Sequence, residues 1–179
     1  HIADPWKDRA RSEAVIWLAD ECESVLDAGC GGGIGARRFQ ILKPSLKYTG
    51  IDITQEIIDV AKELTGLKSF KVTNIRDFAT WTECFDGVLL SHVIEHHPVS
   101  ELPILTEAIK HVAKSYIAIV LFNMPQMSVT ENLGPDGFYS NTYSQDFLDN
   151  LFGPDFAMTR LVDFLEGNIS EKPERVILY

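Results

Sequence analysis

Clusters of basic residues and long apolar runs are both missing from this chain of 179 residues. No stretch approaches the roughly 20 apolar residues that a membrane-spanning helix requires, so we expect no membrane span. Lysine and arginine number 16 against 26 aspartates and glutamates, and the net charge is −10. Because binding to a phosphate backbone requires a positive field, this balance argues against a nucleic-acid partner.

Cysteine is also scarce, with three thiols at Cys22, Cys30 and Cys84. They have neither CxxC spacing nor an even count, and we interpret them as reduced thiols of a cytoplasmic protein. The chain begins at His1 rather than at a methionine, which leaves open whether residues precede it. The oligomeric state is equally open from the sequence.

What the sequence does contain is an alternation of short apolar runs with segments of helical periodicity. Strands are predicted over Ser24–Ala28, Tyr48–Ile53, Leu67–Thr73, Phe85–Ser91, Tyr116–Phe122, Phe156–Phe164 and Arg175–Tyr179. Strands that alternate with helices imply parallel pairing through right-handed crossovers, whereas the short link before the last strand predicts antiparallel pairing. We therefore predict one domain over residues 1–179, an α/β fold with a doubly wound, mainly parallel sheet under helices.

Three polar residues are predicted to begin helices: Thr54, Ser100 and Thr142, the last in capping-box spacing with Gln145. Residues 123–141 are rich in proline, glycine, serine and asparagine and are long for a connection. This loop is predicted to follow a strand at the ligand-binding edge of the sheet. We interpret it either as part of a substrate lid or as a surface excursion.

The most informative stretch, residues 25–33, reads Val-Leu-Asp-Ala-Gly-Cys-Gly-Gly-Gly. It combines the end of an apolar strand, the carboxylate of Asp27, and a glycine turn that leads into a helix over Ile34–Leu42. Glycine accepts positive φ and lets a ligand approach the main chain closely. A strand, a glycine turn and a helix N-terminus together predict a ligand-binding cradle.

Polar residues also end the next strands, and ligands of open parallel sheets bind at these carboxyl ends. Asp52 could accept hydrogen bonds from a ribose diol or could only cap the following helix. Asn74 could contact an adenine edge or could serve as a turn residue. The fourth strand ends at Ser91, and His92 and His96 follow it.

Two cofactor classes fit a nucleoside at this edge. Gly31-x-Gly33-x-x-Ala36 satisfies the dinucleotide fingerprint, which keeps an NAD(P)-dependent oxidoreductase open. Asp27, however, precedes the glycines and would repel a pyrophosphate. A cofactor with a cationic amino-acid end suits this carboxylate better.

Residues 27–33 resemble the first motif, D/E-x-G-x-G-x-G, of the class I S-adenosylmethionine-dependent methyltransferases. Asp52 is similar to the ribose-binding acid of that family, and Asn74-Ile75 is similar to its adenine-contact pair. Residues 85–96 resemble the fourth-strand motif of a subgroup that includes ubiquinone-biosynthesis and related small-molecule methyltransferases. The resemblance implies a Rossmann-like fold with a seven-stranded sheet, helices on both faces and an antiparallel C-terminal strand.

The resemblance also implies S-adenosylmethionine as methyl donor and S-adenosylhomocysteine as product. The residues expected to bind this cofactor are Asp27, Gly29, Gly31, Gly33, Asp52, Ile53, Asn74, Ile75 and Ser91. The expected acceptor is an oxygen or nitrogen atom of a small molecule. A non-catalytic subunit that binds S-adenosylmethionine remains an alternative.

A sulfonium methyl group is already electrophilic, so transfer requires an in-line nucleophile about 3–3.5 Å away. A base is required only where the acceptor must lose a proton, and His92 and His96 are the candidate catalytic residues. Relatives that bind a divalent cation, including small-RNA 2′-O-methyltransferases, carry Glu-x-x-Glu-His at this strand end. Here the first glutamate is replaced by His92, ahead of Glu95 and His96, and we expect no metal. A metal-assisted RNA 2′-O-methyltransferase remains an alternative.

Overall fold

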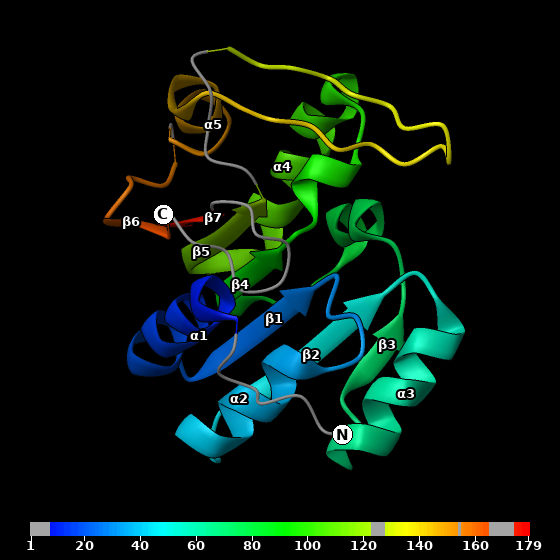
Figure 1. Ribbon diagram of the computed structural model, residues 1–179. Helices are drawn as coiled ribbons and strands as arrows, with labels where there is room; N and C mark the ends of the chain where they lie inside the picture. Colours follow the sequence, from blue (N-terminus) through cyan, green and yellow to red (C-terminus); the bar gives the residue numbers. More distant parts are fainter. Residues whose placement is uncertain (1–7, 123–127, 154, 165–173) are drawn as a thin grey trace.

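The computed structural model describes residues 8–122, 128–153, 155–164 and 174–179. At its centre is a seven-stranded sheet with the strand order β3-β2-β1-β4-β5-β7-β6 (Figure 1). Strands β1 to β5 pair in parallel, and β7 lies antiparallel between β5 and β6. The strands are β1 (Ser24–Ala28), β2 (Lys47–Asp52), β3 (Phe70–Val72), β4 (Phe85–Ser91), β5 (Ala113–Phe122), β6 (Arg160–Phe164) and β7 (Glu174–Leu178). The predicted sheet is therefore confirmed.

Five α-helices in the described residues cover the sheet on both faces. Side chains of α1, α2 and α3, such as Leu18, Phe39 and Ala61, join one apolar cluster. Side chains of α4 and α5, such as Ile109 and Leu148, join a second cluster with the opposite face. The helices are α1 (Arg9–Glu21), α2 (Ile34–Leu42), α3 (Gln55–Thr65), α4 (Leu102–Val112) and α5 (Gln145–Phe152). None of the described helices is both long enough and apolar enough to span a membrane.

The predicted bounds of the strands agree best with those of the structure where a strand lies in the middle of the sheet. The bounds of β1 and β4 are those predicted, whereas β3 is only three residues long against the seven predicted over Leu67–Thr73. β3 lies at the edge of the sheet and pairs with β2 alone. With one partner, fewer of its residues gain ladder hydrogen bonds.

Two of the three predicted helix starts are wrong. Thr54 is the N-cap of α3 as predicted, but the N-cap of α4 is Glu101, because Ser100 lies inside a 3-10 turn that precedes the helix. The N-cap of α5 is Ser144, whose side chain accepts a hydrogen bond from the amide of Phe147. Thr142 is instead paired across a short hairpin.

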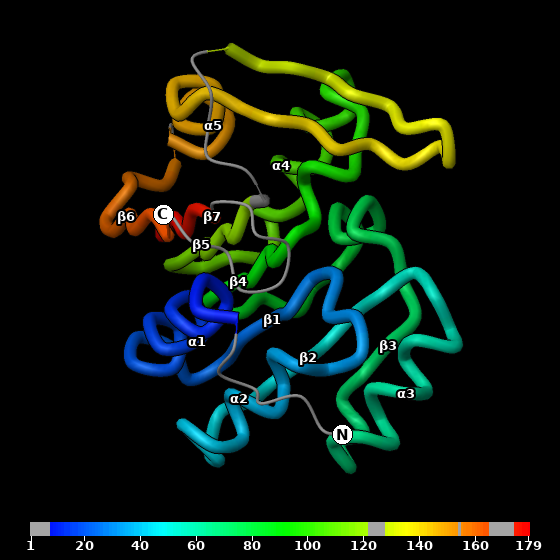
Figure 2. The backbone as a smooth tube through the Cα atoms, viewed as in Figure 1, coloured from blue at the N-terminus to red at the C-terminus, as the bar shows by residue number. Residues whose placement is uncertain are grey.

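Residues 128–142 form this hairpin, which runs past α4 (yellow in Figure 2). The turn after β4 holds it in place: the amide of Asn141 donates to the carbonyl of Glu95 at 3.0 Å, and the hydroxyl of Tyr143 donates to the carbonyl of Ile94 at 2.8 Å. Residues 123–127 of the loop predicted as a lid lie outside the described residues. The role of this segment as a lid therefore stays a prediction.

The close packing of β2 against β3 gives the first testable prediction. A Cβ atom at Gly50 would lie 2.6 Å from the ring of Phe70 and 2.9 Å from the hydroxyl of Tyr48. We expect Gly50→Ala to lower the free energy of unfolding by about 1–3 kcal/mol, because neither buried ring can move without displacing its neighbours. Urea denaturation measures this difference. Gly32→Ala is the control, since its Cβ would meet no atom nearer than 3.8 Å; an equal loss in both variants would contradict the packing argument.

Candidate functional site

The carboxyl ends of β1 and β4 and the start of α2 meet at a cavity of about 70 Å³. Its lining contains a carboxylate, a guanidinium, a hydroxyl and four glycines, and therefore offers both charges and an open main chain. The lining residues are Arg11, Asp27, Gly29, Cys30, Gly31, Gly32, Ile34, Gly35 and Ser91. Five residues of the predicted cofactor site are thus brought together: Asp27, Gly29, Gly31 and Ser91 line the cavity, and Gly33 belongs to the same turn.

Asp27 is the most unusual group of this cavity, with 2% of its surface exposed. Burial raises the pKa of its carboxyl to about 6, although a hydrogen bond from the Tyr48 hydroxyl at 2.8 Å works in the opposite direction. The charges of Arg11 and Arg38 also favour the ionised form. Asp27 is therefore a buried carboxylate that carries its charge at neutral pH and gains from a cationic ligand.

The glycine turn has the backbone that the sequence predicts. Gly29 and Gly33 adopt φ of 81° and 82°, and Gly31 adopts 51°. A Cβ at Gly29 would lie 2.6 Å from the Val93 side chain, and one at Gly35 would lie 2.5 Å from the Asp27 carboxylate. Glycine is required at Gly29 by both conformation and space, and at Gly35 by space.

Asp52 and Asn74 both make local hydrogen bonds. The two carboxylate oxygens of Asp52 accept from the amides of Gly31 at 3.2 Å and Thr54 at 3.0 Å, so this residue holds the glycine turn against α3. The amide oxygen of Asn74 accepts from the amide of Arg76 and caps a 3-10 helix. Each oxygen has a second lone pair, so the local bonds are compatible with the predicted contacts to ribose and adenine.

Beside these residues, Ile53 and Ile75 differ in exposure. Ile53 follows Asp52 and is 70% exposed, whereas Ile75 is 6% exposed. An exposed isoleucine next to the ribose-binding candidate is suited to pack against a flat ring. Their assignment to the cofactor site remains a prediction.

The two predicted catalytic histidines have different surroundings. His92 has a φ of 58°, the one positive φ of a non-glycine residue in the described chain. Its Nδ1 lies 3.5 Å from Glu95, and its Nε2 lies 3.6 Å from Glu174. His96 is exposed, and its Nδ1 lies 2.7 Å from the carbonyl of Tyr139. The side chain of His92, which directly follows Ser91, is 8% exposed.

The motif-based prediction missed Arg11 and Tyr48. The Nε of Arg11 donates to the hydroxyl of Ser91 at 2.8 Å, and Tyr48 holds Asp27. Arg11 reaches the cavity from α1, 80 positions away from Ser91 in the chain. Its only local signal is Asp8, whose carboxylate accepts from the Arg11 amide at the helix start.

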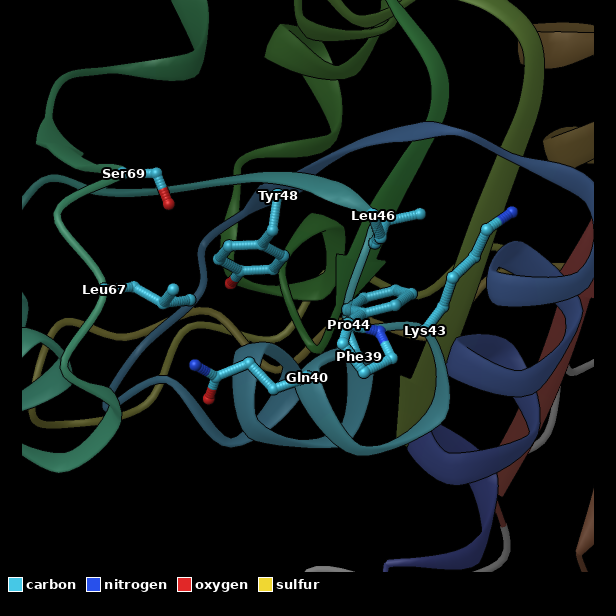
Figure 3. Close-up of a pocket in the computed structure, with 8 residues that line it drawn as sticks. All are labelled: Phe39, Gln40, Lys43, Pro44, Leu46, Tyr48, Leu67 and Ser69. Carbon is cyan, nitrogen blue, oxygen red and sulfur yellow. The ribbon is translucent and has the colours of Figure 1, made fainter.

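A second pocket, of about 340 Å³, lies at the end of α2 and the start of β2 (Figure 3). Phe39, Lys43 and Tyr48 belong to its lining. The ammonium of Lys43 already bonds the carbonyl of Cys22 and the carboxylate of Glu23. The lining of this pocket contains none of the predicted site residues, although its Tyr48 also donates to Asp27.

Residues 25–115 match the family model of a methyltransferase domain, which is half of the chain. The chain belongs to this methyltransferase family. The resemblance to class I S-adenosylmethionine-dependent methyltransferases is thereby confirmed. The glycine turn, Asp52, Asn74 and the end of β4 all fall inside the matched range.

Curated relatives of this methyltransferase domain include the ubiquinone biosynthesis O-methyltransferase of Actinobacillus pleuropneumoniae serotype 7. It is 39% identical over 85 residues, which cover 42% of this chain and 36% of the relative. The mitochondrial enzyme of the same name from Saccharomyces cerevisiae is 36% identical over 80 residues, which cover 41% and 25%. The aligned part is thus between a quarter and about a third of these relatives' length.

Solved structures extend the likeness of the fold to nearly the whole methyltransferase chain. The 1,6-didemethyltoxoflavin-N1-methyltransferase of Burkholderia thailandensis, with S-adenosylhomocysteine bound, superposes with a TM-score of 0.77 at 17% identity. The match covers 98% of this chain and 80% of that enzyme. Magnesium protoporphyrin IX methyltransferase from Synechocystis, also with S-adenosylhomocysteine, gives 0.70 at 18% identity, covering 94% and 80%.

The buried carboxyl of Asp27 predicts a pH dependence of the stability of the methyltransferase domain. Its folded pKa of about 6 lies above the ordinary value of 3.8, so the folded state binds this proton more tightly than the unfolded state. The resulting stabilisation is complete below pH 3.8 and is lost as the pH rises through 6, in total about 3 kcal/mol. We expect Asp27→Asn to become more stable relative to wild type by about 2 kcal/mol between pH 4 and pH 7, since part of the change falls below pH 4.

Urea denaturation at pH 4, 5, 6 and 7 measures the difference between the two proteins. The exposed Asp20→Asn variant is the control and is expected to differ from wild type by a constant amount. A constant difference for Asp27→Asn as well would contradict the assignment.

Proposed function

We propose that this chain transfers a methyl group from S-adenosylmethionine to an oxygen or nitrogen atom of a small-molecule acceptor. The single observation that carries the proposal is the buried Asp27 carboxylate beside the glycine turn. In the proposal, residues 1–179 act as one methyltransferase domain. The matched family and the ligands named for the neighbouring structures support the choice of cofactor.

The charge of the cavity favours a methionine end over a pyrophosphate. The Asp27 carboxylate attracts the ammonium group of an amino acid and repels phosphate oxygens. Arg11, on the same lining, offers a guanidinium that can hold the carboxylate of that amino acid. Asp27 and Arg11 therefore provide opposite charges for the two ends of a zwitterion, which an NAD(P) cofactor lacks.

The ribose and adenine of the cofactor lie beyond this cavity, along the carboxyl ends of β2 and β3. Asp52 accepts the ribose hydroxyls, Ile53 packs on the adenine ring, and Asn74 with Ile75 contacts its edge. Gly29, Gly31 and Gly33 keep the main chain open to the ligand. The sulfonium lies next to Ser91 at the end of β4.

The acceptor atom approaches from the side of the segment after β4. Where the acceptor must lose a proton, His96 is the better candidate for the base. Its Nδ1 lies 2.7 Å from the Tyr139 carbonyl, which places the proton on Nδ1 and makes Nε2 the basic nitrogen of the neutral ring. His92 lies between two carboxylates, with its Nδ1 3.5 Å from Glu95 and its Nε2 3.6 Å from Glu174, and this fixed orientation suits a positioning role.

The proposal includes a small-molecule acceptor and a cytoplasmic location. The net charge of −10 disfavours a nucleic-acid acceptor. All three cysteines are unpaired, which is typical of a reducing compartment. Cys30, within the glycine turn, is buried, and burial raises the pKa of its thiol, so it is a packing residue and not a nucleophile.

Calorimetric titration with S-adenosylhomocysteine, NAD and NADP in parallel tests the cofactor. We expect binding of S-adenosylhomocysteine alone, and a loss of affinity by about 10- to 100-fold in Asp27→Asn, because a charged hydrogen bond contributes about 1.5–3 kcal/mol. Affinity is expected to fall as the pH drops below about 6, where the Asp27 carboxyl takes up a proton. The Asp20→Asn protein serves again as control. Binding of NAD with no response to S-adenosylhomocysteine would overturn the proposal.

A labelled methyl donor tests whether the domain is catalytic. Incubation with a metabolite extract is expected to transfer label to a product of low molecular mass, and Asp27→Asn is expected to reduce the transfer at least tenfold at subsaturating donor. Chromatography of the labelled products measures the result. Tight binding of S-adenosylhomocysteine without any transfer in extracts would favour the non-catalytic alternative.

A further inference from the structure

Three buried polar side chains from distant parts of the chain meet behind Ser91. They are Asp8, just before α1, His92, just after β4, and Glu174, at the start of β7. One ligand atom of each lies within 4.8 Å of the other two. Asp8 and Glu174 are 3% and 2% exposed, and the side chain of His92 is 8% exposed.

Each of the two carboxylates has one buried oxygen that accepts no hydrogen bond from any described residue: Oδ2 of Asp8 and Oε1 of Glu174. The other oxygen of Asp8 is fixed, because it accepts from the amide of Arg11 at 2.9 Å. Oδ2 has ion-pair neighbours only, at 3.3 Å from Arg11 and 3.9 Å from Arg38. Oε1 of Glu174 has His92 Nε2 at 3.6 Å. Burial and the nearby charge of Asp8 raise the pKa of Glu174.

The charges of the described residues around this group do not balance. Two further carboxylates lie near Asp8 and Glu174. Glu95 lies 3.5 Å from Nδ1 of His92, and Asp27 interacts with the charges of Arg11 and Arg38. Arg11 and Arg38 are the cations that oppose these four carboxylates. The carboxylates around this group therefore outnumber the guanidiniums, and the excess of negative charge favours a bound cation.

The ring of His92 is oriented as a metal ligand would be. Its backbone is held at φ 58°, a conformation that a residue with a side chain adopts at a cost of about 1–3 kcal/mol and that is typical of functional positions. Glu95 lies beside Nδ1, and Nε2 is directed toward Glu174. A carboxylate behind one ring nitrogen, with the other nitrogen facing an ion, is the usual arrangement at histidine metal sites.

We propose that Asp8, His92 and Glu174 bind a divalent transition-metal ion of the zinc or manganese type. One imidazole with two carboxylates suits these ions, whereas Mg²⁺ prefers oxygen ligands alone. Bonds of about 2.0–2.2 Å require ligand atoms about 3–4 Å apart, so the three side chains need to close by roughly 1 Å. Three protein ligands leave a coordination position for water or for an acceptor oxygen.

This ligand set differs from the Glu-x-x-Glu-His pattern, in which Glu95 and His96 would be the ligands. Glu95 orients the ring here, and His96 contacts the hairpin. The site also shares no ligand with the cofactor cavity. The inference therefore does not depend on S-adenosylmethionine as the cofactor.

The inference is tested by removing bound metal with a chelator and then measuring which metal ions the protein binds. After dialysis against Zn²⁺, Mn²⁺ or Mg²⁺ singly, elemental analysis is expected to find one Zn²⁺ or Mn²⁺ per chain and little Mg²⁺. Calorimetry is expected to give at least 100-fold weaker Mn²⁺ binding for Asp8→Asn and for Glu174→Gln. Asparagine keeps the helix cap of Asp8, so that variant separates metal binding from folding. Glu95→Gln is expected to weaken binding about 10- to 100-fold, as loss of an orienting carboxylate does.

Two controls identify adventitious binding. Glu107→Gln removes a carboxylate that is 73% exposed and is expected to leave the affinity unchanged. Cys84→Ser removes the most accessible thiol and is expected to retain Zn²⁺. Wild-type protein that retains neither Zn²⁺ nor Mn²⁺, or variants at Asp8 and Glu174 that retain both ions as wild type does, would overturn the inference. Titration of the chelator-treated protein with S-adenosylhomocysteine tests the proposed function separately.

Discussion

The burial of one negative charge, on Asp27, dictates the arrangement of the residues around it. A carboxylate in the interior is costly unless hydrogen bonds and opposite charges compensate for lost water. Tyr48 donates to it, and the positive charges of Arg11 on α1 and Arg38 on α2 favour its ionised form. Gly35 lets α2 approach so closely that a single methyl group there would collide with the carboxylate. The cavity is thus shaped by the requirements of this charge.

A chain of charged groups extends from Asp27 across the end of the sheet. Arg11 and Arg38 lie between Asp27 and Asp8, and beyond Asp8 the side chains of Glu174 and His92 follow. The proposed cofactor site and the proposed metal site are therefore the two ends of one electrostatic network, which meet at the arginines. A ligand that neutralises Asp27 changes the balance at Asp8. For this reason a cation bound at one site is expected to change the affinity of the other site for its ligand.

Much of the fold could be predicted because its signals are local. The strand over Phe85–Ser91 is an apolar run with polar ends, and the glycine turn follows from residues next to each other. The first residues of the helices were harder to predict, because several serines and threonines near a helix start could serve as the N-cap. Tertiary pairing decides which of them does so: Thr142 pairs with Thr130, and Ser144 caps α5. Arg11 and Tyr48 could not be predicted, because they reach Asp27 from other elements of the sheet and its helices. The sequence carries no spacing that relates them.

The strand order explains why the second half of the site escapes motif analysis. In a parallel sheet only the carboxyl ends of strands reach the ligand-binding edge, and motif searches examine those ends. β7 runs in the opposite direction, and its first residue, Glu174, pairs with Phe122 at the carboxyl end of β5. An antiparallel strand therefore delivers a residue from its amino end to the same edge, where the sequence offers no turn motif to mark it. In a sheet closed by such a strand, that first residue belongs among the site candidates, because topology alone places it beside the residues that end the parallel strands.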